Sequence, residues 1–258
     1  MRATSKPSPD AQEDRLLTAR VGDAVSSTQA GGPPKFIGFL DERAAAAAQA
    51  AAAAQGCDRT LLFGGYEQAE RRMLGVFPQW CEPAPEQFPV GAVTLYFRAQ
   101  ESLTHRDFLG SLMSLGIKRE AVGDILTAQG KAVVFLSAEL VGYVMGQLDR
   151  VGGAGVRLIS GVDGELPAAA QFREISATVA SERLDCVVGA LCGLSRTKCA
   201  ALIEGGLVSL RHTVCQRASA AVEAGDKLSV RGQGKFIVDA LDQRTRKGRI
   251  ILSARKYI

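Results

Sequence analysis

The sequence is poor in histidine and in closely spaced cysteine. Its 258 residues include two histidines, and its six cysteines form no CxxC pair. A zinc site needs several such ligands at short spacing, so this pattern argues against one. No apolar run reaches the ~20 residues of a membrane helix, and the polar first fifteen residues lack the apolar core of a secretory signal. We therefore expect a cytoplasmic protein with reduced thiols and no metal or cofactor.

Glycine-rich nucleotide loops and catalytic clusters are also absent. Residues 64–72 read GGYEQAERR, which fits neither GxxxxGK[ST] nor GxGxxG, so we interpret them as a turn into a helix from about Glu67. His105, Asp107 and Ser111 lie close in sequence, but a helix surface does not align them for nucleophilic attack. We therefore predict no catalytic residue.

Positive charge is concentrated at one end of the chain. Residues 173–258 contain 15 Lys and Arg against 8 Asp and Glu, a net charge of +7, whereas residues 1–172 contain 16 against 19, a net charge of −3. A basic segment on a mildly acidic body predicts a module that binds a polyanion. Charge alone does not distinguish RNA from DNA or acidic lipid.

The fold class expected from the pattern is α+β, beginning with an N-terminal α/β region at residues 1–86. It should contain a helix near residues 12–20, a linker at 26–34 and a helix with ten alanines between Asp41 and Gly56. Because alanine has little to bury, we expect this helix on the surface. Four prolines in residues 78–89 indicate an interdomain linker.

Residues 87–165 predict a ferredoxin-like βαββαβ domain. Thr104 and Asp107 have capping-box spacing at the start of its first helix. Many RNA-binding modules have this topology, but the exposed rings of an RNA-recognition motif are missing, with Phe135 as the single candidate. Any RNA contact is therefore expected at the turn GIKRE, through Lys118 and Arg119.

Residues 173–240 predict a two-helix hairpin on a small sheet. In the first helix Leu184, Val187, Val188 and Leu191 share one face. Ser195 can cap the second helix, whose buried stripe comprises Cys199, Leu202 and Ile203. Arg196 and Lys198 flank this stripe, where they could engage successive phosphates or form an ordinary solvated helix face.

The stretch from ERLDCVVGALCGLSRTKCAALIEGGLVSL to GDKLSVRGQGKF resembles an S4 RNA-binding domain over about 55 residues. In that family the two-helix face docks structured RNA. The resemblance implies RNA-binding roles for Arg183, Ser195, Arg196, Lys198, Lys227, Arg231 and Lys235. One departure is Arg211-His212, where the family often has an Asn-Gly turn. Residues 241–258 are expected to be a basic C-terminal extension in which Arg246 and Lys247 enlarge the RNA surface.

Upstream, FGGYEQAERR and LTHRDFLGSLMSLGIKREAVGDIL precede this module. That order resembles the YlmH type of S4-domain protein, whose members are ribosome-associated. The resemblance implies that the chain binds ribosomal RNA of the large subunit, with tRNA as a further candidate, in translation or ribosome quality control. We also expect a monomer that binds no membrane.

Two alternatives remain open. The triplet Arg183–Asp185 resembles a catalytic motif of pseudouridine synthases, so the chain could be an RNA-modifying enzyme such as a pseudouridine synthase or an rRNA methyltransferase. Against this, Asp185 has a structural explanation within the S4-like helix. The second alternative is non-specific binding of the basic segment to DNA or a membrane surface.

Overall fold

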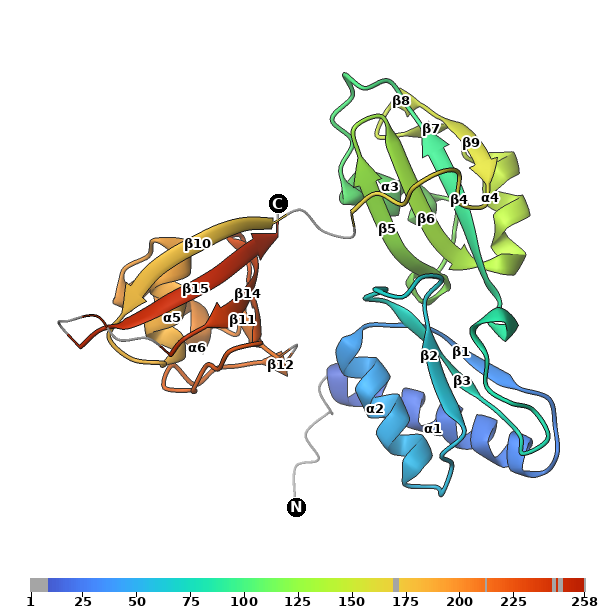
Figure 1. Cartoon of the computed structure of the whole chain (residues 1–258), viewed down its shortest axis with the longest axis horizontal. Helices are drawn as coiled ribbons and strands as arrows, with labels where there is room; N and C mark the ends of the chain where they lie inside the picture. Colours follow the sequence, from blue (N-terminus) through green and yellow to red (C-terminus); the bar gives the residue numbers. More distant parts are fainter. Residues whose placement is uncertain (1–8, 169–171, 212, 243–244, 246–247, 258) are drawn as a thin grey trace, which may run out of the picture. The chain divides into compact units, whose positions relative to one another are not determined.

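A computed structural model describes residues 9–168, 172–211, 213–242, 245 and 248–257. Its contacts divide the chain into two compact units, residues 1–169 and residues 170–258. Both units combine helices with antiparallel sheets (Figure 1).

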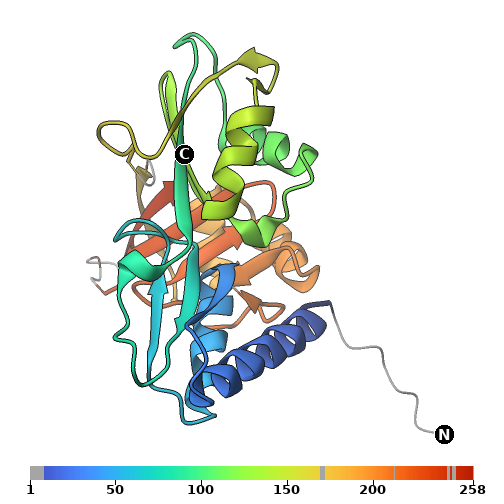
Figure 2. The ribbon, with the colours of Figure 1, turned by 90° about the vertical axis from the view of Figure 1, so that its right-hand side faces the viewer.

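The first unit begins with helix α1, a small sheet and helix α2. The elements are α1 Pro9–Gln29, β1 Lys35–Leu40, α2 Glu42–Ala53, β2 Thr60–Phe63 and β3 Arg72–Val76, with strand order β1-β3-β2. Figures 1 and 2 show both helices on one side of this sheet. The first helix runs past residue 20 to Gln29, so the linker predicted from residue 26 is wrong.

The alanine-rich helix is not confined to the surface as expected. Ala45, Ala48 and Ala52 are at most 1% exposed, and the latter two pack with Val21 and Leu74 in one apolar cluster. These positions lie on one helix face by their spacing of three and four residues. Alanine is too small to fill much space, but it lets α2 approach α1 and β3 closely.

The second part of this unit is connected to the first sheet through residues 78–89, which lie within one compact unit. It comprises η1 Pro85–Gln87, β4 Val90–Tyr96, α3 His105–Ser114, η2 Arg119–Ala121, β5 Val122–Ala128, β6 Lys131–Ser137, η3 Ala138–Leu140, α4 Val141–Gln147, β7 Arg150–Val151, β8 Ala154–Gly155 and β9 Arg157–Ser160. The sheet order is β5-β6-β4-β9, and all pairs are antiparallel. The main elements follow the predicted order, with the short β7–β8 pair added. The predicted capping box of Thr104 and Asp107 is present.

A buried carboxylate joins the two parts of the first unit. Asp124 is 9% exposed and accepts hydrogen bonds from the Tyr66 hydroxyl at 2.7 Å and from the backbone amides of Glu70 and Arg71 at 2.7 and 3.0 Å. Because these amides are bound to β5, the chain after β2 makes a turn directly into β3. The helix predicted from Glu67 is therefore wrong.

The second unit is a six-stranded antiparallel sheet with two helices. Its elements are β10 Phe172–Val179, α5 Leu184–Cys192, α6 Arg196–Glu204, β11 Val208–Leu210, β12 Thr213–Val214, β13 Lys227–Val230, β14 Gly234–Ala240 and β15 Ile250–Tyr257. The strand order is β10-β15-β14-β13-β11-β12. Strand β15 thus lies between β10 and β14, so residues 250–257 of the predicted C-terminal extension form a strand within the sheet.

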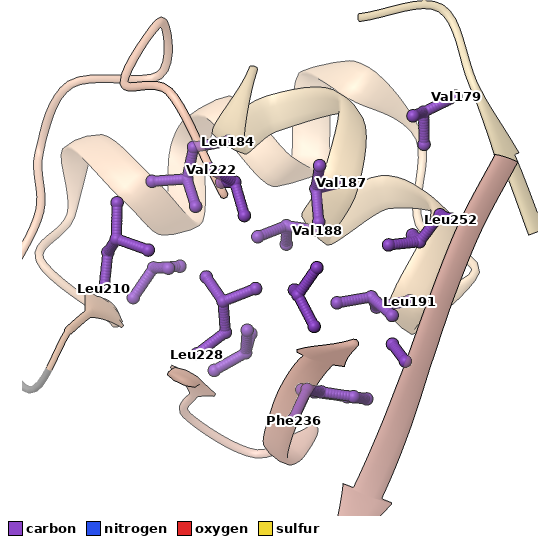
Figure 3. Close-up of a cluster of buried hydrophobic side chains, with 14 of the residues drawn as sticks. Val179, Leu184, Val187, Val188, Leu191, Leu210, Val222, Leu228, Phe236 and Leu252 are labelled. Carbon is purple, nitrogen blue, oxygen red and sulfur yellow. The ribbon is translucent and has the colours of Figure 1, made fainter. Parts of the chain in front are cut away.

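The core of the second unit lies between the helices and one face of the sheet. All four α5 side chains predicted to share a face are buried, and in Figure 3 they point toward Leu228, Phe236 and Leu252 of the strands. Burial of each such side chain contributes about 1.5–3 kcal/mol. This core fixes the direction in which the charged side chains of the hairpin must point.

No single helix among the described residues is long and apolar enough to cross a membrane. Helices α5 and α6 pass that test only as a pair, and they are bent by 115° at the break between them.

Candidate nucleic-acid interface

The turn between α5 and α6 places two cations at the start of α6. Gly193 ends α5 in the left-handed conformation with φ 65°, and the Ser195 hydroxyl caps α6 by accepting from the Lys198 amide at 3.4 Å. Cys199 and Ile203 are fully buried one turn further on. Because the apolar stripe faces the core, Arg196 and Lys198 are exposed on either side of it, as predicted.

A buried carboxylate brings two of the predicted arginines together. The Asp185 side chain is 4% exposed and accepts from Arg183 Nε at 3.0 Å, from Arg183 Nη2 at 2.9 Å and from Arg196 Nε at 3.3 Å. It also accepts from the Cys186 amide at 3.0 Å. The hydrogen bonds from Arg183, aided by Arg196, lower the pKa of Asp185 to about 2 despite the opposing effect of burial.

The two arginines keep much of their surface in solvent. Their side chains are 41% exposed at Arg183 and 71% exposed at Arg196. Each arginine has several N–H donors in a planar fork, and Asp185 occupies only part of them. The remaining donors can bind phosphate oxygens, so the two arginines form a cationic site whose position is fixed by the buried Asp185. We call Arg183, Arg196 and Lys198 the hairpin cations.

The remaining predicted residues of this unit lie elsewhere. Lys227 and Lys235 precede the core residues Leu228 and Phe236, so strand alternation puts both lysines on the sheet face away from the helices. Arg231 is exposed in the turn between β13 and β14. The seven residues for which the resemblance implies RNA-binding roles are therefore divided between a helix side, a sheet face and a turn.

The turn after β11 has its own buried acceptor. Arg211 adopts φ 52°, and its guanidinium donates to Asp226 at 2.6 and 2.9 Å. Asp226 is 7% exposed. This ion pair holds the Arg211 side chain against the protein, so the turn that departs from the S4 pattern is closed by a salt bridge. His212 lies outside the described residues, as do Arg246 and Lys247.

The GIKRE turn of the first unit presents one cation. Lys118 is exposed, but Arg119 is half-buried and donates to the Val122 carbonyl at 2.6 Å. Burial, and then the nearby charge of Arg71, lower the pKa of Arg119 to about 10. Part of the Arg119 guanidinium therefore binds the backbone of β5, and Lys118 is the more exposed cation of this turn.

An aromatic cluster that the sequence patterns did not indicate lies on the open face of the six-stranded sheet in the second unit. Phe172 and Tyr257 form a T-shaped pair with ring centroids 4.9 Å apart, and the Arg255 guanidinium lies 4.9 Å from the Phe172 ring centre. The alternation of apolar and polar residues in β15 could have indicated which of its side chains point away from the core. The pairing of β15 with β10 could not be found that way, because the paired residues Phe172 and Tyr257 are 85 positions apart in the sequence.

The described residues contain no group of three or more His, Cys, Asp or Glu side chains arranged for a metal. All six cysteines are free thiols. Burial raises the pKa of Cys192 to about 11, which is the opposite of what a reactive thiolate needs.

Comparison with known proteins identifies the family. Residues 83–162 match the family described as "Putative RNA-binding domain in YlmH". The chain is 34% identical over 188 residues to the ribosome-associated protein quality control protein P2 of Bacillus subtilis (strain 168), covering 71% of this chain and 72% of that protein. A solved structure, cell division protein ylmH from Streptococcus pneumoniae, has the same fold over 58% of this chain and 92% of that chain, with a TM-score of 0.51 and 20% identity. The chain therefore belongs to the YlmH family.

Proposed function

We propose that this protein is a non-catalytic RNA-binding protein that docks structured RNA through residues 172–257, folded as an S4 domain. The observation that carries this proposal is the pair Arg183 and Arg196, held on the helix hairpin by the buried Asp185. The description of the matched family as an RNA-binding domain supports an RNA ligand. Phosphate contacts of this kind position a module on RNA without reading base sequence.

The first unit supplies a second RNA-binding part in this proposal. The sheet order β5-β6-β4-β9 supports a ferredoxin-like domain at residues 90–160, which lie within the matched family region, residues 83–162. Lys118 is the exposed cation at its GIKRE turn. We infer that this domain and the S4 domain bind the same RNA.

The proposed target is ribosomal RNA of the large subunit, with tRNA as a further ligand, and the proposed role is ribosome quality control in the cytoplasm. The support is the name of the relative from Bacillus subtilis, a ribosome-associated quality control protein. Crosslinking the protein to RNA in cells and sequencing the attached fragments tests the target. Enrichment of large-subunit rRNA is the expected result, and enrichment of unrelated RNA or DNA contradicts it.

The geometry of Asp185 argues against the enzymatic alternative. A catalytic aspartate must reach a nucleotide, whereas this carboxylate is almost fully buried and bound by two arginines and a backbone amide. We expect no base modification when the protein is incubated with ribosomal RNA. Turnover that disappears in Asp185→Asn would assign the chain to the RNA-modifying enzymes instead.

Substitution of the hairpin cations tests the proposal directly. We expect Arg196→Ala to weaken binding of a labelled rRNA hairpin in fluorescence anisotropy and to lower the salt slope of log affinity by about 1. Arg15→Ala, which removes an exposed arginine from α1, is the control of equal charge change. Equal affinities for the wild type, Arg196→Ala and Lys198→Ala would contradict the proposed face.

A further inference from the structure

The sheet of the second unit has a face that the helices do not cover. Its core face carries Phe236, Val238 and Leu252, which pack against α5 and α6. Alternation puts Phe172 and Tyr257 on the opposite face, where they are paired across neighbouring strands. Both rings are only half-buried in the described structure.

The aromatic pair is held in a fixed arrangement. Arg255 donates to both carboxylate oxygens of Asp239 at 2.8–3.1 Å, and its guanidinium lies over the Phe172 ring. Two rings and a planar guanidinium thus meet on the open face of β10, β14 and β15. We call Phe172, Tyr257 and Arg255 the sheet-face cluster.

Positive charge lies beside this cluster on the open face. Lys235 is exposed on the same face, in the strand next to Tyr257. Arg173 and Lys256 are paired at the same end of the sheet, but alternation puts both on the core face, where the Lys256 ammonium lies 5.5 Å from the Phe236 ring centre. The nearest acidic side chains are Glu174, which is paired with Arg255 across the strands, and Asp239, whose charge Arg255 balances.

We propose that the sheet-face cluster is a second RNA-binding site that stacks unpaired bases of single-stranded RNA. Aromatic rings and arginine planes stack bases of any identity, and flanking lysines bind the connecting phosphates. A protein partner would bury the rings as well, but Lys227 and Lys235 on this face of the sheet complement a polyanion. This inference rests on the proposed function, and it adds a site on the face opposite the hairpin cations.

A fluorescein-labelled uridine decamer tests the site on the full-length protein. We expect Tyr257→Leu to weaken decamer binding between about fivefold and about 150-fold, because one stacked base is lost. Tyr257→Phe keeps the ring and should bind within about twofold of the wild type. Tyr143→Leu removes an exposed tyrosine from α4 and serves as the control.

Two further measurements separate this site from the proposed function. Tyr257→Leu should leave the affinity for the rRNA hairpin unchanged, whereas Arg196→Ala should lower it. A decamer carrying 5-iodouridine should crosslink to Phe172 or Tyr257 on irradiation, and this needs no variant that might fold poorly. Failure of the wild type to bind the decamer, equal binding by Tyr257→Leu, or crosslinks only to other residues would each overturn the site without affecting the hairpin result.

Discussion

Asp185 and Asp124 are buried aspartates that each hold several hydrogen-bond donors in place. Asp185 holds Arg183 and Arg196 at the helix hairpin, and Asp124 holds Tyr66 and the backbone of the β2–β3 turn against β5. In both cases a carboxylate removed from water is stabilised by several donors. Removal of one partner from such a network leaves the other buried groups unsatisfied. It therefore lowers the free energy of unfolding more than the loss of a surface ion pair does.

The ion pairs of Asp185 predict a pH dependence of stability. Its pKa falls on folding from about 3.8 to about 2, so its contribution is complete well above pH 4 and is lost as the pH falls toward 2. Because its arginine partners are partly exposed, we expect a contribution of about 1–2 kcal/mol. Urea unfolding of wild type and Asp185→Asn at pH 6 and pH 3 measures it, and a difference between the proteins that does not shrink at pH 3 would contradict this account.

The Tyr66 hydroxyl predicts a second effect at the residue scale. Tyr66→Phe removes its 2.7 Å hydrogen bond to Asp124 and keeps the ring stacked on Phe135. We expect a loss of about 1–3 kcal/mol in the free energy of unfolding, because the bond is to a buried charge. Tyr96→Phe, which removes a hydrogen bond to the exposed Asp163, should cost less. Equal losses of unfolding free energy in the two variants would show that the burial of Asp124 does not strengthen its hydrogen bond with Tyr66.

At the scale of elements, helix α2 depends on the small size of its inward residues. Ala48 is fully buried, whereas Ala50 on the same helix is exposed. We expect Ala48→Leu to destabilise the protein by about 1–3 kcal/mol through overpacking, and Ala50→Leu to be nearly neutral. Thermal unfolding of both variants distinguishes them, and a neutral Ala48→Leu would mean that α2 is loosely packed.

Local sequence patterns predicted those elements whose boundaries are set by nearby residues. The Thr104–Asp107 capping box and the Ser195 cap both lie where spacing predicted them. The β2–β3 turn was mispredicted because Asp124, more than 50 residues away, binds its amides. The inward face of α2 was mispredicted for the same reason, because Val21 and Leu74, which pack with it, come from other segments of the chain.

At the scale of the whole molecule, the chain combines two units that each present cations. Motif spacing identified the hairpin cations, and the structure adds the buried Asp185 that fixes two of them. It also separates Lys227 and Lys235 from that group, because sheet alternation turns them to the opposite face. Strands β10 and β15 are distant in the sequence, so their pairing, and with it the sheet-face cluster, could be identified only from the structure.

Co-sedimentation with purified large ribosomal subunits tests the central claim most directly. The wild type and the Arg15→Ala control should pellet with the subunits at physiological salt. Arg183→Ala/Arg196→Ala should remain in the supernatant, because the cationic pair anchored on Asp185 is then missing. If the double variant is folded and pellets as completely as the wild type, the helix hairpin is not the RNA-binding surface.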